Sequence, residues 1–221
     1  KSENTGDYQC SLSYDGIVEW TNDETSHNFE SNSYITINVP EAGTLESVLS
    51  DKKINPADIE NLKLTGCLNE TDFNYIRSRM SRNLRRINLK EVRFVHVLAR
   101  SYWSNEQQCH IDEYFDDYLP NNAFENMTYL RHIILPVDLK RIGRYAFNGV
   151  ELTSSLLLPE GLTHVYDHAF CGVFSIEMPS SLEYIGEWVF RSGITGELRL
   201  TDNLKHIGRG AFLDAQLTGT F

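Results

Sequence analysis

The sequence lacks the features that mark an enzyme, a membrane-spanning protein or a nucleic-acid-binding protein. It has no apolar run approaching the roughly 18 residues that a transmembrane helix needs. It has no phosphate-binding loop, no zinc-protease motif and no nucleophile elbow. Lysine and arginine number 20 against 31 aspartates and glutamates, so a basic footprint for nucleic acid is missing. These absences favour a non-catalytic protein that needs no cofactor.

The acidic excess lies in two short stretches. Residues 1–33 contain seven acids and one base, and residues 101–118 contain five acids and no base. The rest of the chain is balanced, with 19 residues of each sign. Residues 1–33 are also polar and begin without methionine, which is typical of a mature exported sequence or of a trimmed chain.

Cysteine is scarce. Cys10, Cys67, Cys109 and Cys171 form no C-x-x-C pair, and no histidine lies at zinc-finger spacing. We therefore expect no metal site. An exported protein could pair the four thiols into two disulfides, but their spacing does not demand it.

A repeat of 20 to 23 residues organises the C-terminal half. The pattern L-x-x-I-G-x-x-A-F occupies residues 139–147 and returns, with variations, at 162–170, 182–190 and 204–212. A degenerate earlier copy brings the count to five from residue 119 onward. The phenylalanines that mark the copies are Phe124, Phe147, Phe170, Phe190 and Phe212.

Between these patterns lie short apolar-x-apolar segments, most of them followed by proline. The alternation predicts a short strand with one buried face, which the proline ends. Because one unit cannot bury its own leucine, isoleucine and phenylalanine, the units must stack and align their strands as a parallel ladder. Glycine at 143, 186 and 208 is expected at a tight corner with positive φ. The predicted strands cover residues 133–135, 156–158, 176–178 and 198–200, with Ile134, Leu157, Glu177 and Arg199 facing outward.

The earlier part of the chain predicts related elements. Residues 62–64 and 87–89 indicate two further strands, and Asn69 with Asp72 offers a helix cap between them. Residues 34–39 predict a strand, and the spacing of Leu45, Val48 and Leu49 predicts an amphipathic helix. The expected fold is thus an α/β repeat, a leucine-rich-repeat-like solenoid with short parallel strands. It comprises a polar N-terminal segment (1–33), a small N-terminal cap (34–60) and the solenoid (61–221), with an insertion near 101–118.

The repeat resembles the BspA-like leucine-rich repeat family of bacterial surface and cell-adhesion proteins. Ala169-Phe170-Cys171-Gly172 and Leu158-Pro159 fit that family's core, turn and strand. The resemblance covers residues 119–221 well and 62–100 loosely. It implies an exported bacterial protein, secreted or at the cell surface, with room for a lipid anchor upstream of Lys1. It also implies adhesion to a protein or extracellular-matrix ligand, but it transfers no binding residue, because the family's motif residues are structural.

Candidate binding residues are those that the repeat does not dictate. Stacking should align them in two columns, and exposed tyrosine and tryptophan give large contact areas at low entropic cost. We therefore predict an aromatic stripe that binds a protein or a glycan; the alternative is that the rings merely pack over the corners. His164 and His168 do not belong to a zinc-protease motif, so we do not interpret them as metal ligands. One column contains Asn122, Tyr145, His168, Trp188 and Gly210, and the neighbouring column contains Arg141, His164, Tyr184 and His206.

The insertion near 101–118 is a second candidate. It clusters carboxylates with Tyr102, Trp103 and Tyr114. Carboxylate clusters can hold calcium, but the spacing of a calcium loop is absent. Long insertions in repeat proteins often carry recognition, so the segment remains a binding hypothesis beside the alternative of a solvated loop.

Together these observations predict a non-catalytic binding module of a bacterial cell-surface or secreted protein. Its partner would be a protein or matrix ligand, with no nucleic acid and no membrane span. Two alternatives remain open. One is a carbohydrate-binding accessory protein that uses the aromatic stripe, and the other is a purely structural repeat module of a longer surface protein.

Overall fold

A computed structural model describes residues 10–12, 18–20, 34–104, 109–153, 155–171, 176–191, 195–197 and 200–218. The chain divides into two units, Lys1–Asn32 and Ser33–Phe221. In the first unit, β1 (Cys10–Leu12) pairs antiparallel with β2 (Val18–Trp20). The candidate binding residues all lie in the second unit.

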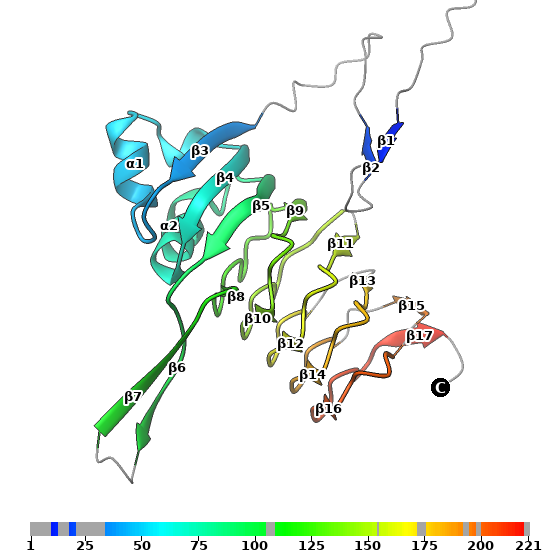
Figure 1. Ribbon diagram of the computed structural model, residues 1–221. Helices are drawn as coiled ribbons and strands as arrows, with labels where there is room; N and C mark the ends of the chain where they lie inside the picture. Colours follow the sequence, from blue (N-terminus) through cyan, green and yellow to red (C-terminus); the bar gives the residue numbers. More distant parts are fainter. Residues whose placement is uncertain are drawn as a thin grey trace, which may run out of the picture. The chain divides into compact units, whose positions relative to one another are not determined.

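A four-stranded parallel sheet opens the second unit, in the order β3-β4-β5-β9. Its strands are β3 (Ile35–Val39), β4 (Asn61–Leu68), β5 (Arg86–Phe94) and β9 (His132–Ile134). Helix α1 (Leu45–Asp51) and the 3-10 turn η1 (Pro56–Asp58) connect β3 to β4, and α2 (Glu70–Met80) connects β4 to β5 (Figure 1). The early strands and both helices predicted from the sequence are confirmed. In the described residues, no helix is long and apolar enough to cross a membrane.

The predicted cap of α2 is also confirmed, and it connects the two helices. The side chain of Asn69 accepts a hydrogen bond from the Thr71 amide. The buried Asp72 carboxylate accepts one from the Asn69 amide at 3.0 Å. It accepts two more from the amides of Gly43 and Leu45, at 2.7 and 2.9 Å. One carboxylate thus satisfies the free amides at the start of α2 and beside the start of α1, which would otherwise be costly to bury.

The repeats form a parallel sheet of five two-residue strands. These are β8 (Tyr118–Leu119), β10 (Arg141–Ile142), β12 (His164–Val165), β14 (Tyr184–Ile185) and β16 (His206–Ile207). They follow one another in chain order along one side of the repeats (Figure 1). This sheet is built from the isoleucine part of the repeat pattern, which the sequence indicated as core but not as strand. Helices occur only before the repeats in the described residues, so α1 and α2 supply the helical part of the predicted α/β class.

The strands predicted from the apolar-x-apolar segments lie on the other side of the repeats. They include β9 and the parallel pair β11 (Leu156–Leu157) and β13 (Ile176–Glu177). Leu157 faces outward as predicted and is 53% exposed, whereas Leu156 is buried. A further parallel pair joins β15 (Thr195–Glu197) and β17 (Gln216–Thr218). The strand predicted at 198–200 falls partly outside the described residues, as do Arg199 and the side chain of Glu177.

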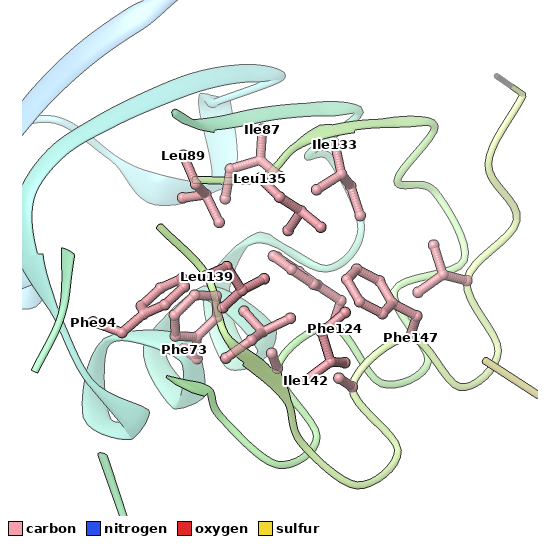
Figure 2. Close-up of a cluster of buried hydrophobic side chains, with 14 of the residues drawn as sticks. Phe73, Ile87, Leu89, Phe94, Phe124, Ile133, Leu135, Leu139, Ile142 and Phe147 are labelled. Carbon is pink, nitrogen blue, oxygen red and sulfur yellow. The ribbon is translucent and has the colours of Figure 1, made fainter. Parts of the chain in front are cut away.

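The phenylalanines of the repeat form one continuous column in the core. Successive rings from Phe124 to Phe212 stack with centroids 5.0 to 5.5 Å apart. At the N-terminal end the column continues into Phe73 of α2, whose ring meets Phe124 edge-on at 5.4 Å (Figure 2). The helical segment and the repeats therefore share one hydrophobic core.

The glycines at the corners have a different role from the one predicted. Gly143 and Gly208 do not have positive φ. Instead, each passes so close to the preceding repeat that a Cβ would collide with its backbone. On Gly143 that atom would lie 2.6 Å from the Asn121 nitrogen, and on Gly208 it would lie 2.4 Å from the Gly186 carbonyl carbon. The expectation of positive φ at these glycines was wrong; close packing of backbone on backbone explains them.

The insertion expected as a loop near 101–118 is an antiparallel hairpin that begins earlier. Strand β6 (Val97–Ser104) pairs with β7 (Cys109–Phe115), and the hairpin projects from the N-terminal end of the five-stranded sheet (Figure 1). The Asn121 side-chain amide donates to the Ala99 carbonyl oxygen, and the His96 amide donates to the Asp116 carboxylate. The first contact attaches the hairpin to the repeats, and the second joins the two ends of the hairpin at its base.

The core column makes a prediction about stability. Phe170 is fully buried between Phe147 and Phe190, whereas Phe212 stacks on one described ring and is only partly buried. Phe170→Ala should lower the free energy of unfolding by about 3–5 kcal/mol, through lost burial and the cavity left behind. Phe212→Ala, the matched control, should lower it by about half as much. Chemical denaturation measures both, and equal losses would contradict the continuous column.

Candidate binding surface

The second predicted column lies on the outer face of the five-stranded sheet. Arg141, His164, Tyr184 and His206 are the first residues of β10, β12, β14 and β16, and the parallel register places them side by side. The second residue of each strand lies on the other face. Ile142, Val165 and Ile185 are fully buried there, whereas Ile207, in the last strand of the sheet, is 45% exposed. We call these four outward residues the sheet column. Because side chains alternate along a strand, burial of one face leaves the other to solvent.

Aromatic rings in the sheet column stack on one another. Tyr184 lies between the two histidines, with ring centroids 5.6 Å from His164 and 4.6 Å from His206 and interplanar angles of 20° and 9°. Stacked rings cover each other's faces, so the Tyr184 hydroxyl and the imidazole nitrogens lie at the edges. A sugar ring binds an aromatic residue across its face. The geometry of this stack therefore gives less support to the predicted glycan site than to a surface that offers hydrogen bonds from ring edges.

The N-terminal end of the sheet column meets the hairpin. The guanidinium of Arg141 lies over the ring of Phe115, 4.6 Å from its centroid. Tyr118, the residue of β8 paired with Arg141, is buried, and its ring is 5.8 Å from that of Tyr166. Tyr166 stands where other repeats have glycine. Burial raises the pKa of its hydroxyl, and the nearby Arg141 guanidinium lowers it. The sequence did not predict that Phe115 and Tyr118 lie beside the repeats. Tyr118 aligns with Arg141, but no sequence signal places Phe115 there.

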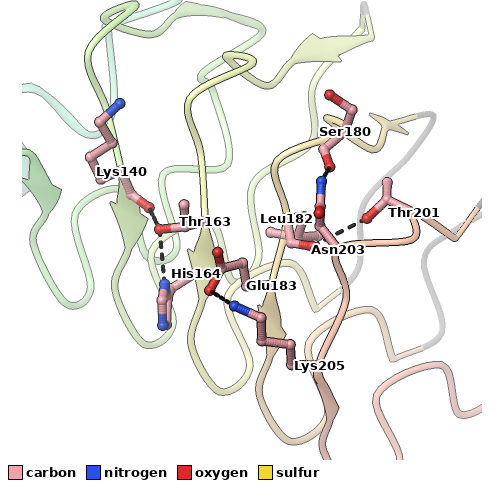
Figure 3. A network of polar contacts seen from close by, with 9 residues as sticks. All are labelled: Lys140, Thr163, His164, Ser180, Leu182, Glu183, Thr201, Asn203 and Lys205. Carbon is pink, nitrogen blue, oxygen red and sulfur yellow. Dashed lines mark hydrogen bonds and ion pairs between the residues drawn. The ribbon is translucent and has the colours of Figure 1, made fainter.

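Charges around His164 make its neutral form more stable. Partial burial lowers the pKa of His164, and the nearby Arg141 lowers it further, with a smaller contribution from Lys205. Glu183 opposes them but is itself paired with Lys205 at 2.9 Å (Figure 3). The Nδ1 atom of His164 lies 2.9 Å from the Thr163 hydroxyl, which donates to the Lys140 carbonyl oxygen. Two cations thus act on His164 against one carboxylate. At Tyr184 the balance is reversed, because burial, Asp167 and Glu187 raise the pKa of its hydroxyl against Arg144 alone.

The first predicted column follows the strands by a few residues and forms the turns. Asn122, Tyr145, His168, Trp188 and Gly210 all have positive φ, between 56° and 63°. Tyr145 stacks on His168 at 4.7 Å, with an interplanar angle of 4°. We call these five residues the turn column.

The ring of Trp188 lies against the backbone of the next repeat. A Cβ on Gly210 would lie 2.6 Å from the indole carbon Cε3, which leaves room there for glycine alone. Arg191 and Arg209 place their guanidinium groups 5.6 and 5.8 Å from the ring centroid. Trp188 therefore packs over a corner, as one of the two descriptions predicts, and it is only half-buried. A binding role for its ring stays a prediction.

The third group of predicted residues lies on the hairpin. Tyr114 is 40% exposed, and its ring stacks on His96 at 4.0 Å. Tyr102 and Trp103 lie in β6, opposite Ile111 and His110, but their side chains are outside the described residues. No described contact joins Tyr114 to the sheet column.

Metal and thiol chemistry receive no support from the described residues. In that part of the chain, no three histidine, cysteine, aspartate or glutamate side chains are grouped to hold a metal ion. Cys67 and Cys171 are free thiols, and the side chains of Cys10 and Cys109 lie outside the described residues. Burial raises the pKa of the Cys171 thiol, which disfavours the reactive thiolate.

Comparison with known proteins identifies the repeats. A family model described as the BspA type leucine rich repeat region matches residues 117–220 with 6 copies, one more than the five counted from the sequence. The chain also resembles a solved leucine-rich repeat protein of T. pallidum, TpLRR, with 26% identity and a TM-score of 0.35. That match covers 53% of this chain and 64% of the other. No curated protein matches.

The turn column makes a testable prediction about what its rings do. A bulky residue in the left-handed region costs about 1–2 kcal/mol relative to glycine, and asparagine tolerates that region best after glycine. An aromatic stack contributes about 0.5–1.5 kcal/mol. Because these terms nearly cancel, Tyr145→Asn should change the free energy of unfolding by about 1 kcal/mol or less.

Chemical denaturation of the purified protein measures this change. Tyr166→Asn serves as a control, because Tyr166 has an ordinary backbone conformation and contacts Arg141 and Tyr118. It should destabilise the protein more than Tyr145→Asn does. A loss above about 3 kcal/mol for Tyr145→Asn would mean that its ring is structural.

Proposed function

Residues 117–220 form a BspA-type leucine-rich repeat region, and on that premise we propose that the chain is a non-catalytic protein-binding module of a bacterial surface or secreted protein that serves adhesion. The observation that carries the proposal is the sheet column. Regular backbone hydrogen bonds hold its four residues in register, and their side chains have no catalytic arrangement. Such repeats typically bind proteins along a surface of aligned side chains.

The composition of the sheet column suits a protein partner. Tyrosine and arginine are enriched where protein interfaces gain most of their binding energy. Ring stacking fixes the side chains before a partner arrives, so less conformational freedom is lost on binding. The partially buried His164 and Tyr184 support the same interpretation, because they are already packed on one another.

We further propose that the repeats continue as one solenoid to the end of the family match, so that the sheet column runs along its flank. The hairpin then stands at one end of that surface and adds residues outside the repeat. An extracellular-matrix protein is the partner class we propose, in line with adhesion.

The test is binding to a panel of purified matrix proteins, with a glycan array in parallel. The variant carries Arg141→Ala, His164→Ala and Tyr184→Ala. Its matched control carries Val137→Ala and Leu157→Ala, two exposed apolar residues, 51% and 53% accessible, outside the sheet column. We expect the triple variant to lose at least about tenfold in affinity, which is about 1.4 kcal/mol, and the control to bind as the original chain does.

Thermal unfolding of both variants shows that each remains folded. Equal binding by the triple variant and the original chain would refute the role of the sheet column. Binding to neutral glycans alone would refute the protein-binding proposal and favour the carbohydrate-binding alternative.

A further inference from the structure

Arg141 is held in one position before any ligand is present. Its guanidinium lies over the Phe115 ring of β7, 4.6 Å from the centroid, and it is close enough to the Tyr166 hydroxyl to lower the pKa that burial raises. A ring from outside the repeats and a side chain from the next repeat therefore flank Arg141. An arginine side chain that is free to move loses rotamer entropy when it binds. Stacking on a ring uses the face of the guanidinium and leaves N–H groups at its edge.

The carboxylates near Arg141 are engaged elsewhere. Asp167 pairs with Arg144 at 3.1 Å and accepts a hydrogen bond from the Glu187 amide. Glu183 pairs with Lys205, and Glu113 of the hairpin pairs with Arg100 at 2.6 Å. In the part of the chain that the structure describes, no carboxylate forms an ion pair with Arg141. Its charge is thus available to a partner, although the chain as a whole carries a net charge of −11.

The neighbours of Arg141 on the sheet column carry no carboxylate. His164, Tyr184 and His206 present ring edges with nitrogen and hydroxyl groups, because their faces stack on one another. Two cations, Arg141 and Lys205, act on His164 against the single carboxylate of Glu183. Near Arg141 the column therefore offers one cation and the polar edges of neighbouring rings.

We infer that the sheet column binds a carboxylate-bearing segment of a partner protein, with an Asp or Glu side chain accepted by the edge of the Arg141 guanidinium. This inference deepens the proposed function and rests on it. A guanidinium edge matches the two oxygens of a carboxylate in a bidentate pair, which is among the stronger hydrogen-bonded pairs in proteins. The polar edges of Tyr184 and the two histidines then form further hydrogen bonds with the same segment.

A second copy of this chain fits the same surface less well. Two sheet columns facing each other would offer Arg141 of one copy no carboxylate, because the column of the other copy consists of an arginine, two histidines and a tyrosine. Two arginines brought together across an interface repel each other. A neutral sugar is also a poorer occupant, because the ring faces are covered. An acidic partner segment supplies the charge that the column lacks.

The experiment uses the full chain and two fluorescein-labelled peptides of alternating glycine with glutamate or glutamine. Fluorescence anisotropy at about 50 mM salt, where ion pairing is weakly screened, measures their binding. We expect the glutamate peptide to bind at least tenfold more tightly than the glutamine peptide. Arg141→Gln should weaken glutamate-peptide binding by about tenfold or more.

Two further variants distinguish a specific contact of the peptide with Arg141 from a non-specific attraction to positive charge. Arg93→Gln removes the same charge from an exposed arginine of β5 and should change binding less than twofold. Arg141→Lys keeps the charge but not the two-pronged edge, so its binding should fall between those of Arg141→Gln and the original chain. Thermal unfolding confirms that each variant is folded.

Three results would overturn the inference: unchanged binding in Arg141→Gln, an equal loss in Arg93→Gln, or tighter binding to an acidic oligosaccharide such as oligogalacturonate than to the peptide. The outcome is distinguishable from that of the matrix-protein test. If matrix binding depends on the sheet column but the glutamate peptide does not bind, the acidic-partner inference falls and the protein-binding proposal stands. If the peptide binds through Arg141 but no protein of the matrix panel does, the proposal of adhesion falls instead.

Discussion

Each repeat is joined to the next by backbone hydrogen bonds in two places, the short strand and the turn that follows it. In the strand the bonds run backward: the amides of Lys205 and Gly208 donate to the carbonyl oxygens of Glu183 and Ile185, each at 2.8 Å. In the turn they run forward: the Trp188 amide donates to the Arg209 carbonyl oxygen at 3.1 Å. With both places joined, neighbouring repeats can neither slide nor rotate relative to each other. Equivalent residues must then lie about 4.8 Å apart, the spacing of paired strands.

This register explains the core and the surface together. Inside, it stacks the phenylalanines at 5.0 to 5.5 Å, so each ring fills the space that its neighbours leave. It also brings backbone so close to backbone that Gly143 and Gly208 have no room for a side chain. Outside, the same spacing makes exposed rings stack and offer their edges. The chemistry of the surface is therefore limited before any partner is considered: aromatic residues here provide rigidity and hydrogen bonds more than flat faces.

The sequence predicted what the repeat itself determines. Its period, its buried columns, the outward position of Leu157 and the cap at Asn69 and Asp72 follow from local patterns of residue type, and the structure confirms them. The pairing of β6 with β7 could not be predicted in the same way. Polar and aromatic residues are mixed in both strands, so the alternation of buried and exposed positions is not visible in the sequence. A shift of one strand by two residues would also leave the same side chains on each face. The position of Phe115 against Arg141 depends on how the hairpin leaves the sheet, which is a matter of tertiary structure. The left-handed turn positions were missed because tyrosine, histidine and tryptophan occupy them, where glycine is the usual indicator.

A surface made of equivalent repeats does not by itself fix the position of a ligand, because a ligand that fits one repeat also fits the next. The junction with the hairpin removes that redundancy. Among the described members of the sheet column, Arg141 alone carries a guanidinium, and only there does a ring from outside the repeats lie against the column. Tyr166, a side chain where neighbouring repeats have glycine, completes the contact. A partner that needs Arg141 is thus bound in one register along the repeats, while the stacked rings beyond it supply area. The repeat gives the surface its extent, and the residues that break the repeat give it a defined position.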